Sequence, residues 1–234
     1  NMNQIAQHLL QVKERIAQAA ERASRNLQQI RLLAVSKTKP VEAIMAAHAA
    51  GQRRFGESYA QEAATKIDTL RQQPEYCDIE WHFIGPLQSN KSKLVAERFD
   101  WVQSVDRDKL IDRLNNQRPT TMAPLNVCLQ INISGESSKS GTSEQEIFRL
   151  AELVSQSERL VLRGLMAIPE HTSDEGVLAA QMTRMQTLFT ELARQYPTVD
   201  TLSMGMTEDL ELAIAHGSTM VRVGTAIFGA RDYS

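Results

Sequence analysis

An alternation of short apolar runs with amphipathic segments extends along the whole chain, and it constrains the fold more than any other feature. Apolar runs begin near residues 31, 53, 79, 101, 125, 160, 201 and 220. Each run ends in polar or glycine residues, and a helical pattern or helical turn follows it. Runs of this kind are typical of strands buried on both faces of a parallel sheet. These units predict a closed (β/α)8 barrel of the TIM type, with an open doubly wound sheet as the alternative.

The predicted helices carry apolar residues at helical spacing. In the segment before the first strand, these are Ile5, Leu9, Val12 and Ile16. An extra N-terminal helix is therefore predicted in front of the barrel. After the fifth strand, Ser143 and Glu146 have the spacing of a capping box, which predicts that a helix begins at Ser143. No linker rich in proline or glycine interrupts the pattern, so residues 1–234 are expected to form a single domain.

Composition excludes several classes of function. The 234 residues carry a net charge of -2, and lysine and arginine are scattered among the acidic residues, which argues against nucleic acid as a partner. No apolar stretch is long enough to span a bilayer, and the N-terminus does not resemble a secretory signal, so a cytoplasmic location is expected. Two cysteines without a CxxC motif and five dispersed histidines predict neither a disulfide framework nor a metal site. A monomer is expected.

The stretch from Leu32 to Pro40 places Lys37 where the first strand, expected over residues 31–38, gives way to a helix. Ligands of parallel α/β folds gather at the carboxyl ends of the strands. A lysine at that position is therefore a candidate for chemistry. The alternative is an ordinary solvated lysine in a loop.

The ends of the last two strands supply small residues, hydroxyl groups and backbone amides. The residues concerned are Ser203, Met204 and Gly205 after the seventh strand, and Arg222, Gly224 and Thr225 at the eighth. In barrels, the loops after these two strands often bind phosphate. Glu208 and Asp209 would repel a phosphate, and we expect them to point outward. On spacing alone, Gly205 and Gly224 are equally well explained as turn and packing glycines.

A lysine opposite a phosphate site fits a phosphorylated carbonyl compound held as a Schiff base. Two ligand classes remain open on this argument: a sugar phosphate, as in Schiff-base aldolases, or pyridoxal phosphate (PLP). Arg222 lies on the same strand face as Gly224. In a PLP site, an arginine there could hydrogen-bond the pyridine nitrogen, keep it unprotonated and make the ring a poor electron sink.

Several stretches closely resemble the pyridoxal phosphate homeostasis protein family. They are AVSKTKP (34–40), FGESYAQE (55–62), WHFIGPLQSNK (81–91), INISGESSKSG (131–141), RGLMAIP (163–169), LSMGMTEDLELAI (202–214) and VRVGTAIFGAR (221–231). The resemblance covers essentially the whole chain. It implies a PLP-binding barrel of fold type III, related to the barrel domain of alanine racemase.

The resemblance also implies roles for individual residues. Lys37 would hold PLP as a Schiff base, and Arg222 would face the pyridine nitrogen. The phosphate would be cradled by the loops that contain Ser203, Met204, Gly205, Gly224 and Thr225. His82 and Met166, at the ends of the third and sixth strands, would lie near the rim of the pocket, where the alternative for each is packing. Ser58 stands where the family motif GEN has asparagine, so it would keep that contact only through a water.

The resemblance favours a PLP carrier over an enzyme. Alanine racemases have a second, β-rich domain and use a tyrosine from a partner subunit, and no residues for that domain are expected after the eighth strand. We therefore expect a homeostasis protein that holds PLP and supplies PLP-dependent apoenzymes, with a weak amino-acid racemase as the alternative. Lys139, in the loop after the fifth strand, is either a second basic site or a solvated loop lysine.

Overall fold

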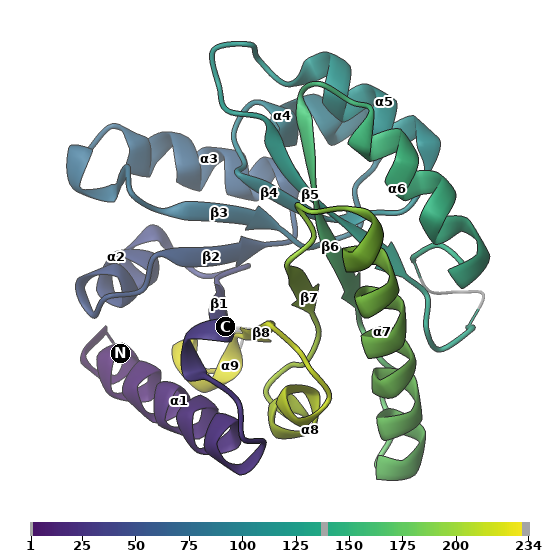
Figure 1. Ribbon diagram of the computed structural model, residues 1–234. Helices are drawn as coiled ribbons and strands as arrows, with labels where there is room; N and C mark the ends of the chain where they lie inside the picture. Colours follow the sequence, from purple (N-terminus) through teal and green to yellow (C-terminus); the bar gives the residue numbers. More distant parts are fainter. Residues whose placement is uncertain (1, 137–139, 231–234) are drawn as a thin grey trace.

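Eight parallel strands form a closed barrel in the computed structural model, which describes residues 2–136 and 140–230 (Figure 1). The strands are β1 Arg31–Val35, β2 Arg54–Glu57, β3 Glu80–Phe83, β4 Trp101–Val105, β5 Leu125–Ile131, β6 Leu160–Ala167, β7 Thr201–Ser203 and β8 Met220–Val223. Each strand pairs with its neighbours in sequence, and β1 pairs with β8 to close the ring. The predicted (β/α)8 barrel is confirmed, and the open sheet is excluded. Lys139 lies outside the described residues.

Helices surround the barrel and connect its strands (Figure 1). The α-helices are α1 Met2–Arg22, α2 Val41–Ala49, α3 Ala60–Arg71, α4 Ser92–Ala96, α5 Asp108–Gln117, α6 Ile147–Ser155, α7 Glu175–Gln195, α8 Leu210–Ala215 and α9 Thr225–Phe228. Four 3-10 turns accompany them: η1 Leu27–Gln29, η2 Pro74–Tyr76, η3 Ser89–Lys91 and η4 Glu144–Glu146. In the described part of the chain, no helix combines the length and hydropathy needed to cross a membrane.

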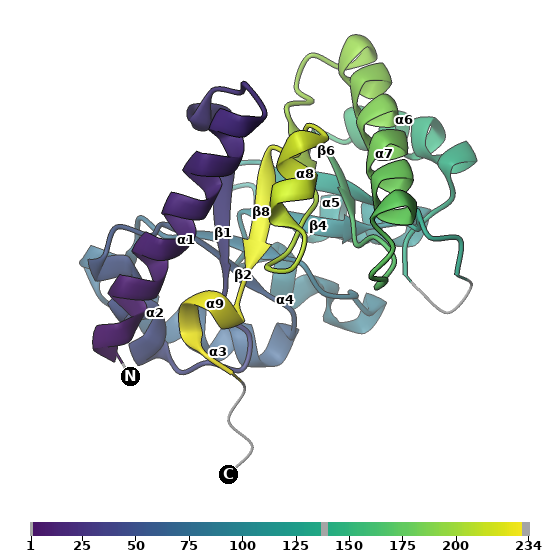
Figure 2. The same ribbon diagram turned by 90° about the horizontal axis from the view of Figure 1, so that it is seen from below.

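Helix α1 covers the place where the first and last units of the barrel meet. It packs against α2, α8 and α9 (Figure 2). The four apolar residues that predicted this helix are all buried. On its polar side, Arg15 donates to both carboxylate oxygens of Glu211 at 2.9 and 2.8 Å and to the carbonyl of Thr207 at 2.9 Å. Because α8 and α9 are short, α1 supplies much of the cover over the last two barrel units.

The strands end earlier than the apolar runs suggested. β1 ends at Val35 rather than at residue 38, and β8 ends at Val223 although the apolar run continues to 229. In the second case the extra apolar residues form α9, whose Ile227 is buried. The predicted capping box is wrong: the side chain of Ser143 makes no cap bond, η4 follows it, and α6 begins at Ile147.

Adjacent leucines on α1 test how far this helix supports the barrel. Leu9 is 1% exposed and Leu10 is 59% exposed. We expect Leu9→Ala to lower the free energy of unfolding by about 2–4 kcal/mol, because it removes buried methyl groups and leaves a cavity. Leu10→Ala is the matched control and should change it by less than about 0.5 kcal/mol. Equal effects in urea unfolding would show that α1 does not pack as described.

Candidate functional site

Lys37 lies in the turn that follows β1, beyond the last strand residue. Its side chain is exposed and lines a cavity of about 310 Å³. The cavity is lined by Val35, Lys37, Thr38, Lys39, Tyr59, Gly224, Thr225 and Gly229. Lys37 and two of the residues predicted to bind phosphate therefore share one cavity. Lys39, which the sequence did not single out, donates its Nζ to the carbonyls of Gly229 and Ala230 at 3.2 and 3.0 Å.

The two predicted phosphate glycines differ in what they contact. A Cβ added to Gly224 would lie 3.4 Å from the side chain and carbonyl of Val35, which is ordinary van der Waals contact, so packing alone does not require glycine there. Gly205 has φ +105°, and an added Cβ would lie 2.5 Å from the Cβ of Ala213. Packing against α8 and a left-handed backbone therefore explain Gly205 without a ligand.

Glu208 and Asp209, the two acidic residues after β7 that were expected to point outward, differ from each other in the structure. Glu208 is exposed, as expected. Asp209 instead accepts a hydrogen bond from the backbone N–H of Met206 at 2.6 Å. That amide is therefore already paired within the loop. Asp209 acts as a local cap, and this side of the rim offers an anion fewer free donors than its glycine suggested.

Arg222 is a buried cation in the barrel interior. Its side chain donates to the hydroxyl of Ser203 at 2.8 Å and to the carbonyl of Ala167 at 3.0 Å, and the residue is 3% exposed. Among the described residues no carboxylate lies within ion-pair distance of it. Burial lowers the pKa of Arg222 to about 10, so it remains protonated at neutral pH. A buried cation with only neutral partners favours a further hydrogen-bond acceptor beside it.

A chain of hydrogen bonds leads from Arg222 through the barrel interior. Ser203 accepts from Arg222 and donates to Gln103 Oε1 at 2.6 Å. The Nε2 of Gln103 lies 2.9 Å from Nδ1 of His82, whose Nε2 lies 2.9 Å from Glu80. Burial lowers the pKa of His82, so a neutral ring accepts at Nδ1 and donates at Nε2. Each group in this series of hydrogen bonds thus donates to the next, from the Arg222 cation to the Glu80 carboxylate.

The other predicted residues lie outside the Lys37 cavity. His82 is fully buried and stacks on Trp101, with ring centroids 4.8 Å apart, so it lies inside the barrel rather than at the rim of this cavity. Met166 packs with Trp101 and Cys128, and Met204 is buried in the main core. Ser58 lines a neighbouring cavity that shares Tyr59 with the first.

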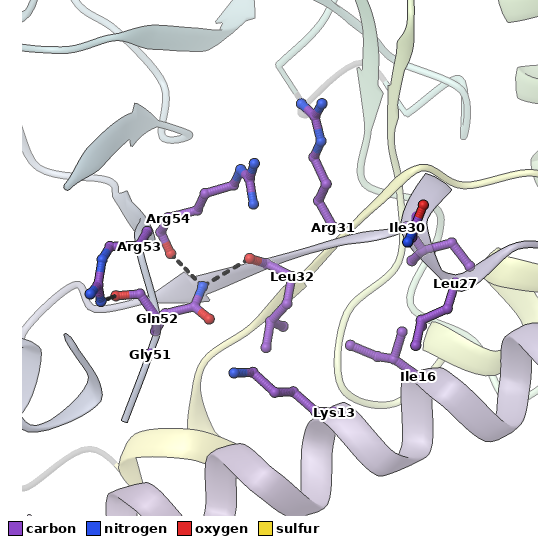
Figure 3. A pocket seen from close by; sticks show the side chains of 11 residues that line it. Lys13, Ile16, Leu27, Ile30, Arg31, Leu32, Gly51, Gln52, Arg53 and Arg54 are labelled. Carbon is purple, nitrogen blue, oxygen red and sulfur yellow. Dashed lines mark hydrogen bonds between the residues drawn. The ribbon is translucent and has the colours of Figure 1, made fainter. Parts of the chain in front are cut away.

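The cavity of about 540 Å³ at the other end of the barrel is larger but less suited to a ligand. Figure 3 shows Lys13, on α1, on one side of β1 and the guanidinium groups of Arg31 and Arg54 on the other. Arg53 points away and pairs with Asp78 at 2.7 Å. These cations do not converge on one point. Within the described residues, no group of three or more His, Cys, Asp or Glu side chains could hold a metal ion.

Comparison with known proteins decides the family. The family model for the alanine racemase N-terminal domain matches residues 8–232. A protein of Escherichia coli K12 named pyridoxal phosphate homeostasis protein is 55% identical over 233 residues, which are 100% of this chain and 99% of the relative. The chain belongs to the pyridoxal phosphate homeostasis protein family.

Solved structures agree with this family assignment. The Synechococcus elongatus protein PipY, described as having PLP bound, superimposes with a TM-score of 0.79 at 35% identity. That match covers 96% of this chain and 100% of PipY. Alanine racemase from Corynebacterium glutamicum has a TM-score of 0.72 at 16% identity, over 98% of this chain and 62% of the racemase. At that identity the likeness concerns the fold alone. The pyridoxal phosphate homeostasis proteins thus share their barrel with alanine racemases.

Substitutions of Gln103 and Ser104, two neighbouring residues on β4, test how much the buried series of hydrogen bonds stabilises the fold. Gln103→Leu leaves the Ser203 hydroxyl without its acceptor and Nδ1 of His82 without its donor, and we expect it to lower the free energy of unfolding by about 1–3 kcal/mol. The hydroxyl of Ser104 is buried and has no hydrogen-bond partner among the residues that the structure describes. Ser104→Ala is therefore the control and should be neutral or slightly stabilising. Equal losses in the two variants would mean that the chain contributes nothing beyond packing.

The pH dependence of stability tests the hydrogen bond between His82 and Glu80, at the end of the same chain. Burial alone would raise the pKa of Glu80, but the hydrogen bond from His82 and the charges of Arg54 and Arg31 outweigh it and lower the pKa below its ordinary value of 4.5. A depressed pKa stabilises the fold above pH 4.5, and this contribution is lost as the pH falls through the lowered pKa. We expect the free energy of unfolding of wild type to exceed that of Glu80→Gln by about 1 kcal/mol at pH 6, because Glu80 is partly exposed. A pH-independent difference in urea unfolding would contradict the assignment.

Proposed function

We propose that this chain binds PLP as a Schiff base on Lys37 and takes part in intracellular PLP homeostasis. The family supports this, since the Escherichia coli relative carries the name pyridoxal phosphate homeostasis protein and PipY is described with PLP bound. The observation that carries the proposal is the cavity shared by Lys37, Gly224 and Thr225. The amine and the turn to which we assign phosphate binding line one small space.

The residues present fit PLP. The amines of Lys37 and Lys39 lie at the cavity, and Gly224 and Thr225 bring backbone and a hydroxyl group to the same lining. Among the described residues Arg222 donates only to a hydroxyl and a carbonyl, and the guanidinium has further N–H groups for an acceptor such as an unprotonated ring nitrogen. When bound, PLP supplies an aldehyde for reversible attachment to an amine and a ring that can delocalise charge.

We assign the remaining predicted residues to support of the ligand. The backbone from Ser203 to Gly205 completes the phosphate side of the rim, while the Ser203 hydroxyl holds Arg222. Met204 and Met166 act through packing. His82 acts on Arg222 through Gln103 and Ser203. Ser58 takes the position of the family asparagine beside the neighbouring cavity.

We further propose that the protein is a carrier and not an enzyme, and that it works as a single-domain monomer in the cytoplasm. PLP-dependent apoenzymes would be the recipients. An arginine beside the ring nitrogen supports this, because it weakens the ring as an electron sink. One observation favours the racemase alternative: Tyr59 lines the cavity with Lys37 and gives it a second group able to transfer a proton. Formation of D-amino acids from single L-amino acids, with sustained turnover, would favour the racemase.

Visible absorption tests the covalent assignment. We expect purified protein mixed with PLP to show the band of a PLP Schiff base, and borohydride reduction with peptide mapping to mark Lys37. Lys37→Ala should lose the band. Lys13→Ala is the control, because Lys13 lines the cavity at the other end of the barrel, and it should keep the band unchanged. A band that survives Lys37→Ala unchanged contradicts the proposal.

A further inference from the structure

The two residues that flank Lys37 are both anchored, although Lys37 itself is not. The side chain of Lys37 makes no hydrogen bond or ion pair with any residue that the structure describes. The hydroxyl of Ser36 donates to Glu57 at 2.5 Å, and its carbonyl accepts from Lys66 at 2.9 Å. The backbone N–H of Thr38 donates to Glu62 at 2.7 Å. The position of the Lys37 amine therefore depends on how its neighbours are held.

Thr38 has a backbone conformation that needs such support. Its φ is +66°, in the left-handed region that a β-branched residue rarely adopts. A conformation of this kind persists only where surrounding contacts hold it. The charge-assisted hydrogen bond from the Thr38 N–H to the carboxylate of Glu62 is such a contact. It fixes the turn immediately after Lys37.

Lys66 connects both anchors. Its side chain is 8% exposed, and its Nζ lies 3.0 Å from Glu57 and 2.6 Å from Glu62. Glu57 is fully buried, and burial raises its pKa although Lys66 opposes that effect. Burial of the charges of Glu57 and Lys66 is costly, and an apolar pair would be about as stable. The charged cluster instead fixes particular atoms of the turn. Glu57 bonds the Ser36 hydroxyl, Lys66 bonds the Ser36 carbonyl, and Glu62 bonds the Thr38 N–H.

We propose that Glu57, Glu62 and Lys66 are positioning residues that hold the turn around Lys37 in the geometry needed to bind PLP. The proposal rests on the proposed function in that Lys37 is the PLP lysine. Electrostatics alone gives the opposite expectation for Glu62. Removal of a carboxylate near a phosphate site should strengthen phosphate binding, whereas loss of the anchor should weaken it. Weaker PLP binding after removal of the Glu62 carboxylate would therefore indicate a lost anchor, and stronger binding would indicate relief of electrostatic repulsion.

The test combines loss of the anchor with a backbone rescue. Glu62→Ala should weaken PLP binding roughly tenfold, as for a lost hydrogen bond to a charged group. Thr38→Gly supplies the reference affinity for a turn that keeps positive φ through glycine, because glycine adopts positive φ readily. The double variant should recover most of the loss, since glycine keeps the turn without the carboxylate. Glu62→Gln retains an acceptor oxygen and should stay within about threefold of wild type.

Binding is followed by titration of the visible band, together with urea unfolding of the PLP-free proteins. Glu42→Ala is the charge control, since Glu42 is exposed in the first turn of α2. It should bind as tightly as wild type or slightly more tightly. Unchanged or tighter binding by Glu62→Ala overturns the proposal. So does a double variant whose binding stays as weak as that of Glu62→Ala, because a purely structural role predicts no rescue.

Amide hydrogen exchange at Thr38 provides a readout that does not require PLP. Its N–H should be protected in wild type and should exchange at least tenfold faster in Glu62→Ala. If borohydride mapping marks a lysine other than Lys37 in wild type, the proposed function fails. The exchange rates then still decide whether the cluster holds the turn. Equal exchange in the two proteins overturns the anchoring itself.

Discussion

The pairing of β1 with β8 is the constraint on which the site depends. The ladder places Leu33 beside Arg222 and Ala34 beside Val223. Because parallel strands end on the same rim, the turn with Lys37 must emerge next to the turn that begins at Gly224. The cavity is thus a product of ring closure between the two ends of the chain, and neither end could form it alone. Helix α1 covers this seam, where α8 and α9 are short.

Two polar systems lie within that frame. Inside the barrel, Ser203 bonds both Arg222 and Gln103, and outside it Lys66 pairs with the two glutamates that contact the turn of Lys37. Hydrophobic burial supplies most of the stabilisation but has no direction. Hydrogen bonds to buried groups are costly to leave unmade, so they specify where particular atoms lie. The core therefore stabilises the barrel, while the polar systems fix the positions of individual side chains and backbone atoms within it.

The number and order of the strands could be predicted because each strand is an apolar run between polar segments. The ends of the strands could not, since an apolar stretch such as the one containing Ile227 can continue a strand or begin a helix. Gln103 and Glu57 carry no local signal, because their partners come from other strands and helices and are defined only after closure. His82 could be assigned to a strand, but its apparent place at the rim ignored that alternate side chains face the barrel interior. A resemblance of motifs indicated Lys37 and Arg222 as candidate site residues but not the residues that contact Arg222 and the turn of Lys37.

Lys37 and Arg222 differ in burial, and this difference agrees with the proposed function. Arg222 is buried and held by two hydrogen bonds, so on that proposal it would orient a ring without moving. Lys37 is exposed, so water and incoming amines would reach a Schiff base formed on it. A Schiff base exchanges through attack at its carbon, and burial of the lysine would slow the exchange. A buried arginine and an accessible lysine are therefore compatible with the reversible holding of a ligand.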